Sequence, residues 1–272
     1  MTTSRHRVYG VDFSGARDAG EKIWIASGVV EADTLRIDAC QQASDLPRSG
    51  KHRDQCLRAL RDFIANETDA AFGLDFPFGL PRTLVRHPRW EDFVLSFPEN
   101  YADPDVFRQI SRQASKGHEL KRVTDEESRT PFSPYNLRLY RQTYYGIRDL
   151  LYPLVRDRAA CVLPMQEPLP HKPWLLEICP ASTLKREKLY RPYKGRDEGR
   201  RAARRHILET LEGKGTLLIP DQVTRSVLLE NQGGDALDSV VAALATFRAL
   251  GDVASLTVKG VVAYALEGYV YV

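Results

Sequence analysis

Two apolar runs of this chain end in the same short pattern of glycine, an apolar residue, aspartate and phenylalanine. Residues 10–13 read Gly-Val-Asp-Phe, and residues 73–76 read Gly-Leu-Asp-Phe. Short apolar runs that are followed by glycine- or proline-containing turns are typical of buried β-strands. We therefore expect two strands, each presenting a carboxylate, Asp12 or Asp75, at its C-terminal end.

The spacing of apolar residues predicts further elements around these two strands. The predicted strands are residues 6–12, 22–30, 34–40, 70–75 and 174–179, and the predicted helices are residues 53–66 and 235–250. A turn at Ala32 and Asp33 joins the second strand to the third. This order predicts an α/β fold of the RNase H-like type, a mixed sheet with a three-strand meander plus parallel strands, flanked by helices. We expect one domain over residues 1–272, with a mostly helical insertion at about 82–173.

Further acidic residues lie where this fold would bring them to the same edge of the sheet. Asp235 and Asp238 are one turn apart on the last predicted helix, roughly 60° apart around its axis. Glu177 lies in the middle of the fifth predicted strand. Structural interpretations also exist, because an acidic residue stabilises a helix N-terminus and a buried glutamate is more often paired with lysine or arginine. The convergence of several carboxylates carries more weight than any one of them.

Clustered carboxylates point to divalent cations. Without compensation they repel one another, which raises their pKa values and destabilises the fold. Mg²⁺ prefers oxygen ligands and is usually held by one or two carboxylates together with substrate phosphate oxygens. Two such ions ~4 Å apart can activate a water molecule and stabilise the leaving oxygen of a phosphodiester. The pattern therefore predicts a site for divalent metal and phosphate.

Basic residues are concentrated in one segment. Residues 185–205 contain ten Lys and Arg against three acidic residues, although the net charge of the chain is only +3. Local basic patches attract polyanions, so Lys194, Arg200 and Arg204 are candidates for gripping a phosphate backbone. A solvated helix face explains the same pattern equally well.

Arginine and tyrosine alternate along the helical stretch predicted at residues 135–158. One stripe is the expected packing face and consists of Leu137, Tyr140, Tyr144, Ile147 and Leu151. The adjacent stripe consists of Arg138, Arg141, Tyr145, Arg148 and Tyr152. Arg141, Tyr145 and Arg148 are therefore candidate substrate contacts, since such side chains can bind phosphates and stack on bases. The alternative, which the pattern favours, is that the tyrosines cover the core while the arginines are solvated.

Several of these motifs resemble a known family. The matching segments are residues 10–15, 73–77, 177–180, 193–194, 234–238 and 267–269. In this order they look like the domain-of-unknown-function 429 family, whose members are predicted RNase H-like nucleases; the match is looser over residues 82–172. The acidic pattern is also similar to that of RuvC-type junction resolvases. The resemblance implies metal-binding and catalytic roles for Asp12, Asp75, Asp235 and Asp238, and it adds Glu177 to the catalytic residues.

We therefore predict a Mg²⁺- or Mn²⁺-dependent nuclease that uses an activated water to hydrolyse the phosphodiester bonds of DNA or RNA. Two alternatives stay open: a non-catalytic nucleic-acid-binding or regulatory protein, and an ATP-dependent phosphotransferase of the actin-like superfamily. No run approaches the ~20 apolar residues that a membrane span requires. The first residues also lack a signal-peptide pattern, so we expect a cytoplasmic protein without a membrane partner. The sequence does not decide the oligomeric state.

Overall fold

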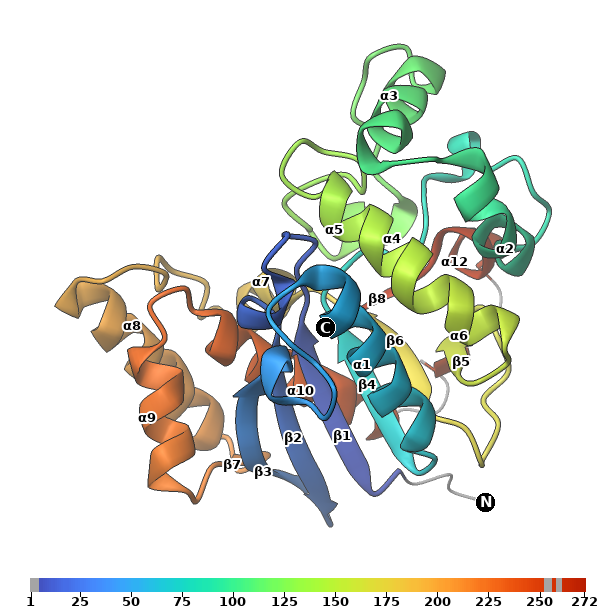
Figure 1. Ribbon diagram of the computed structural model, residues 1–272. Coiled ribbons are helices and arrows are strands. Elements are labelled where there is room, and N and C mark those ends of the chain that lie inside the picture. The colour runs from blue at the N-terminus through green and yellow to red at the C-terminus, as the bar shows by residue number, and fades with distance from the viewer. Residues whose placement is uncertain (1–4, 252–255, 258–260) are drawn as a thin grey trace.

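A mixed β-sheet forms the centre of the computed structural model, which describes residues 5–251, 256–257 and 261–272 (Figure 1). Within these residues the sheet has eight strands in the order β5-β6-β4-β1-β2-β3-β7, with β8 paired to β6. The strands are β1 (Arg7–Asp12), β2 (Trp24–Glu31), β3 (Thr34–Gln42), β4 (Ala70–Leu74), β5 (Cys161–Leu163), β6 (Trp174–Ile178), β7 (Leu217–Leu218) and β8 (Val270–Tyr271).

The strand directions divide the sheet into two parts. β2 runs antiparallel to β1 and β3, and the turn between β2 and β3 lies at Ala32 and Asp33 as predicted. β4 is parallel to β1, and β6 is parallel to β4. The α/β class with a mixed sheet flanked by helices is therefore confirmed, and each of the five predicted strands is present with ends shifted by two residues or fewer.

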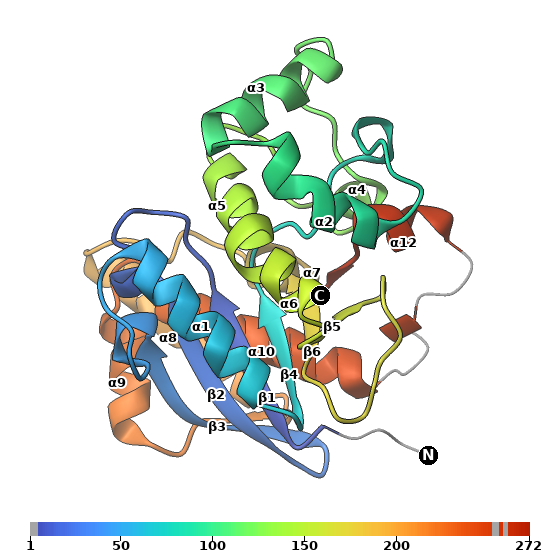
Figure 2. The ribbon, with the colours of Figure 1, turned by 45° about the vertical axis from the view of Figure 1, so that its right-hand side comes forward.

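Helices cover both faces of the sheet (Figures 1 and 2). α1 lies on one face and α10 on the other, close to the predicted bounds of both. The helices are α1 (Arg53–Asn66), α2 (Trp90–Asn100), α3 (Pro104–Ala114), α4 (Val123–Glu127), α5 (Tyr140–Tyr145), α6 (Tyr152–Arg156), α7 (Pro180–Arg186), α8 (Glu198–Glu212), α9 (Gln222–Glu230), α10 (Asp235–Gly251) and α12 (Val262–Glu267), with short 3₁₀ helices at Ala19–Glu21, Ala43–Asp45 and Arg82–Leu84 and a π-helix at Gly146–Leu151 between α5 and α6. No helix in the described ranges is long and apolar enough to cross a membrane.

The insertion between β4 and β6 is mostly helical and packs on the α1 side of the sheet (Figure 2). Buried residues of the sheet, such as Phe72, and of the insertion, such as Phe97 and Tyr144, belong to one hydrophobic cluster. Two details differ from the sequence prediction. The last part of the predicted insertion contains β5, which pairs with β6. The predicted helix starts only at Tyr140, so Leu137 of the expected packing face is 64% exposed.

Candidate functional site

The two carboxylates of the repeated pattern lie at the same edge of the sheet. Asp12 is the last residue of β1, and Asp75 directly follows β4, the neighbouring parallel strand. Val11 lies opposite Leu74 in the register of these strands, and the amide of Asp75 donates a hydrogen bond to the carbonyl of Val11 over 3.0 Å. The structure therefore places both aspartates where the sequence predicts them.

A third carboxylate, Asp238, comes from α10, which lies directly against the strands. Side chains alternate along a strand, so Gly10 faces the same side of the sheet as Asp12. A Cβ atom at Gly10 would lie 1.9 Å from the backbone oxygen of Ser239 in α10, and one at Gly73 would lie 2.0 Å from Oγ1 of Thr246 and 2.9 Å from the backbone oxygen of Ala242 in the same helix. Because the two glycines have no side chain, the helix reaches the sheet and carries Asp238 to the strand ends.

Burial dominates the electrostatics of these three carboxylates. It raises the pKa of Asp12, and the charges of Asp238 and Asp75 raise this pKa further. Burial and the charge of Asp238 together raise the pKa of Asp75 to about 8. Burial also raises the pKa of Asp238. Ionising all three carboxyl groups together is therefore unfavourable, and a bound cation would make their ionised forms more favourable.

Lys194 supplies a positive charge at the edge of this cluster. Its Nζ lies 2.7 Å from Oδ2 of Asp238 and 3.3 Å from Oδ1 of Asp235. The hydroxyl of Tyr193 donates to Oδ1 of Asp238 over 2.6 Å. Burial lowers the pKa of Lys194, but the neighbouring carboxylates of Asp238, Asp12 and Asp235 together outweigh burial and raise this pKa, so the ammonium stays protonated. Among the described residues, the two strand-end aspartates form no ion pair with lysine or arginine.

Glu177 has a different environment from the other predicted acidic residues. Its Oε2 accepts hydrogen bonds from Nη1 of Arg122 and from the amide of Phe78, both over 2.8 Å. Arg122 is only 1% exposed and also donates to Asp125 over 2.8 Å. The arginine pairing considered for a buried glutamate is therefore what the structure shows. This pairing ties the insertion to β6. Burial raises the pKa of Glu177, and the charge of Arg122 opposes that rise.

The basic segment contributes less to a phosphate grip than the sequence predicts. Arg204 is 2% exposed and donates to the carbonyls of Tyr193, Gly195 and Leu229 over 2.6, 3.1 and 2.8 Å. This corrects the expectation that Arg204 binds phosphate, because its guanidinium is used to hold the chain beside Lys194. Arg200 lies nearer the surface, with a 3.8 Å ion pair to Asp197.

The predicted Arg/Tyr stripe is also largely engaged within the protein. Tyr145 is buried, and the guanidinium carbon of Arg53 lies 3.6 Å from its ring centre. Arg148 pairs with Asp149 over 2.6 Å. Arg141 lies 3.8 Å from Asp105 and donates to the hydroxyl of Tyr140. The structure therefore favours the core-covering interpretation and corrects the expectation that Tyr145 stacks on bases.

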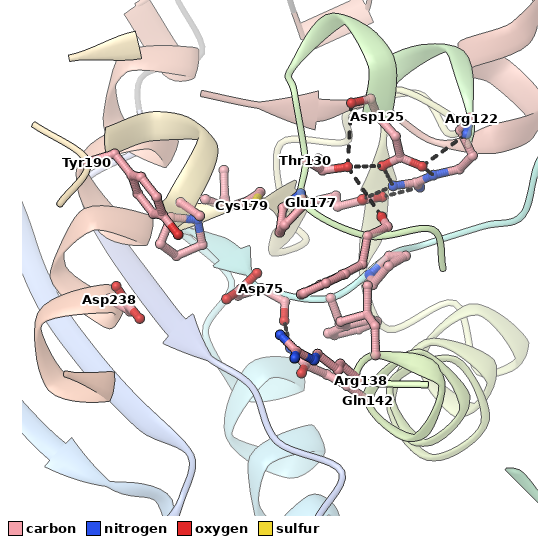
Figure 3. Close-up of a pocket in the computed structure, with 18 of the residues that line it drawn as sticks. Asp75, Arg122, Asp125, Thr130, Arg138, Gln142, Glu177, Cys179, Tyr190 and Asp238 are labelled. Carbon is pink, nitrogen blue, oxygen red and sulfur yellow. Dashed lines mark hydrogen bonds and ion pairs between the residues drawn. The ribbon is translucent and has the colours of Figure 1, made fainter. Parts of the chain in front are cut away.

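The acidic cluster borders a cavity of about 270 Å³ (Figure 3). Asp75 and Asp238 lie on one side of it, and Glu177 with its arginine partner lies on another. The lining residues that were not predicted as site residues include Arg122, Asp125, Phe132, Arg138, Gln142 and Tyr190. Only Arg138, in the Arg/Tyr stripe, and Tyr190, in the basic segment, carried a sequence signal. The other four residues belong to the insertion, and the path of its backbone in the folded protein brings them to the cavity.

Cys179 is the thiol in the lining of this cavity. Burial, and then the charge of Asp75, raise the pKa of Cys179 to about 12. The thiol is therefore protonated at neutral pH, and a protonated thiol is a poor nucleophile.

The donor atoms of the cluster suit a hard divalent cation, because Mg²⁺ and Mn²⁺ prefer carboxylate oxygens. Their spacing is a separate matter: within the described ranges, no group of three histidine, cysteine, aspartate or glutamate side chains is placed to hold a metal ion. The ammonium of Lys194 lies against Asp238 instead, so a divalent ion would have to displace it. Comparison with known proteins gave no matching family model, no matching curated protein and no matching solved structure.

Proposed function

We propose that this chain is a metal-dependent phosphodiester hydrolase, a nuclease of the RNase H-like type. One observation carries the proposal: two parallel strands and one helix bring together Asp12 and Asp238, which are buried, and Asp75, which is half-buried, and both Asp75 and Asp238 line one cavity. Holding like charges together in a buried place costs folding free energy. A cation-binding function accounts for that cost.

The order of the strands supports the RNase H-like part of the proposal. The path β3-β2-β1-β4-β6 consists of a three-strand meander followed by strands parallel to β1. Asp12 ends the first strand, Asp75 directly follows the fourth, and α10 brings Asp238 across them. This is the arrangement implied by the resemblance to the domain-of-unknown-function 429 family.

In the proposed reaction Asp12, Asp75 and Asp238 would hold Mg²⁺ or Mn²⁺, with Asp235 at the rim. Such ions, when bound, activate water and stabilise the leaving oxygen. The hydroxyl of Tyr193 fixes the orientation of Asp238. Lys194, once released from Asp238, would contact a phosphate oxygen of the nucleic-acid strand, DNA or RNA. Arg200 extends this positive surface.

Matched aspartate variants test the proposal. Asp12→Asn and Asp75→Asn keep the side-chain size but remove a carboxylate, so each should reduce Mn²⁺-dependent cleavage of labelled DNA or RNA by at least about 100-fold. Asp33→Asn is the control, because Asp33 is exposed in the β2–β3 turn at the opposite end of the sheet from Asp12. Asp33→Asn should cleave as the parent does.

Cation binding is measured separately on the same variants by calorimetry with Mn²⁺ alone. The parent and Asp33→Asn should bind Mn²⁺, and Asp12→Asn should not. A parent protein that binds no Mn²⁺ and cleaves neither DNA nor RNA would refute the proposal.

The contact between Lys194 and Asp238 favours a second candidate function. If the ammonium is the permanent partner of Asp238, the acidic residues are structural and the protein binds nucleic acid without cleaving it. Lys194→Met distinguishes the two functions. In a hydrolase this variant should bind Mn²⁺ at least as tightly as the parent, because the competing ammonium is gone. In a non-catalytic protein the variant should be destabilised and should gain no metal binding.

A further inference from the structure

The cavity beside the acidic cluster also has an exposed aromatic wall. Tyr190, in the segment between α7 and α8, lines the cavity and is 54% exposed. The Nζ of Lys185 lies 5.3 Å from the centre of the Tyr190 ring and donates a hydrogen bond to the carbonyl of Arg129 over 2.7 Å. More than half of the Tyr190 side chain is therefore accessible to a ligand. The contact of its ring with Lys185, which is itself bonded to Arg129, limits the movement of the ring. Figure 3 shows Tyr190 on the same side of the cavity as Asp238.

Arg138 is the available cation of the Arg/Tyr stripe. It is exposed and lines this cavity, and within the described part of the chain it forms no ion pair with an acidic side chain. Its guanidinium carbon lies 5.5 Å from the ring centre of Phe132, another lining residue. Arg141 and Arg148, in contrast, are directed to Asp105 and Asp149. The stripe therefore has one arginine beside the acidic cluster that is free to bind an anion.

We propose that this cavity binds one unpaired nucleotide of a nucleic-acid strand, with its base against Tyr190 and its phosphate at Arg138. The proposal rests on the proposed function, because it takes nucleic acid as the ligand. A planar base stacks on an exposed tyrosine ring, and an unpaired guanidinium binds phosphate through parallel hydrogen bonds. Tyr190 and Arg138 thus replace Tyr145 and Arg148 as the residues that select the substrate.

The cavity is of a size to hold one nucleotide at a time. Its volume of about 270 Å³ is close to the lower end of the roughly 300–1,000 Å³ found for small-ligand pockets. One nucleotide fills such a space, and the bases of an intact duplex cannot reach the ring because they are stacked on one another. The protein should therefore prefer single strands and frayed ends to blunt duplexes.

Binding of a labelled single strand of about ten nucleotides in metal-free buffer tests the site without cleavage. Tyr190→Ala should weaken binding by roughly 5- to 150-fold, the effect of losing one stacked base. Tyr190→Phe keeps the ring and should bind as the parent does. Arg138→Ala should lower the slope of log affinity against log salt by about 0.7, the value for one lost phosphate contact on a single strand.

Two control variants change the same residue types elsewhere. Tyr152→Ala and Arg156→Ala alter residues that line a different cavity, between α1 and α6. Both should bind the single strand with the parental affinity and salt slope. Thermal unfolding of every variant separates lost binding from lost folding, and Tyr190 and Arg138 are exposed enough that their replacement should leave the midpoint unchanged.

The outcomes separate this inference from the proposed function. Tight binding by the parent that Tyr190→Ala and Arg138→Ala both weaken supports the nucleotide site, even if no metal-dependent cleavage occurs and the hydrolase proposal fails. Metal-dependent cleavage that both variants retain at parental affinity overturns the nucleotide site and leaves the hydrolase intact. A parent that binds duplex as tightly as single strand, or binds neither, also overturns the nucleotide site.

Discussion

Asp75 shows how burial at one residue couples pH to folding. The pKa of its carboxyl rises from an ordinary value of 3.8 to about 8 in the folded protein. Between these two values the folded state holds more protons than the unfolded state, so the free energy of unfolding falls as pH rises. We expect the Tm of the metal-free protein to fall between about pH 5 and pH 8, and to fall less in Asp75→Asn. Thermal unfolding in buffers containing a chelator measures both.

Divalent cations should reverse this effect, since they compete with protons for the same carboxylates. Added Mn²⁺ should therefore raise the Tm more near pH 8 than near pH 6. Asp33→Asn, in the exposed turn, should follow the parental pH dependence. If Asp75→Asn kept the full parental pH dependence, a different group would be responsible for it.

At the scale of elements, the contact of α10 with β1 determines whether a site exists. A Cβ atom at Gly10 would lie 1.9 Å from the backbone oxygen of Ser239 and 2.2 Å from the backbone nitrogen of Ala243. Backbone atoms cannot move aside as a flexible side chain can, so Gly10→Ala must push the helix away from the sheet. We expect a loss of at least about 1–3 kcal/mol in the free energy of unfolding, measured by urea denaturation, and weaker Mn²⁺ binding because Asp238 moves with the helix.

Gly251 provides the matched control on the same helix. Among the residues that the structure describes, a Cβ atom there would meet no atom within 4 Å. Because Gly251 is the last residue of α10, Gly251→Ala should change stability by less than about 0.5 kcal/mol. Equal stability of the two alanine variants would show that the close approach of α10 to β1 is not needed.

Across the whole molecule, one hydrophobic cluster joins the insertion to the sheet. Phe97 of α2 is fully buried in this cluster. Phe97→Ala should therefore lower the free energy of unfolding of the entire chain by about 3–5 kcal/mol. Trp90 reports on the insertion and Trp174 on the sheet, so in each of two variants that keep one of them as the only tryptophan, the midpoint from tryptophan fluorescence should equal the midpoint from far-UV circular dichroism.

Replacing an exposed apolar residue of the insertion is the comparison for Phe97→Ala. Leu137 is 64% exposed, and Leu137→Ala should change stability by less than about 0.5 kcal/mol. A fluorescence midpoint that differs from the circular-dichroism midpoint of the same variant would mean that the insertion unfolds independently, against the shared cluster.

The elements and the acidic edge could be predicted from the sequence because both depend on local patterns. Apolar periodicity over a few residues predicted the central strands, α1 and α10. The repeated Gly-x-Asp pattern placed Asp12 and Asp75 at strand ends, and parallel strands bring such ends to one edge whatever the rest of the chain does. A helical turn likewise fixes Asp235 beside Asp238.

The partners of these residues were decided only by the tertiary structure. Glu177 meets Arg122 from 55 positions away, and Arg204 meets the carbonyl of Leu229 from 25 positions away. Whether a charged side chain binds substrate or closes an internal contact depends on which distant groups packing brings within about 3 Å of it. The spacing of residues along the sequence does not determine such distances. For the same reason the sequence located the carboxylates, while the route of the insertion decided that Arg138 and Tyr190 share their cavity.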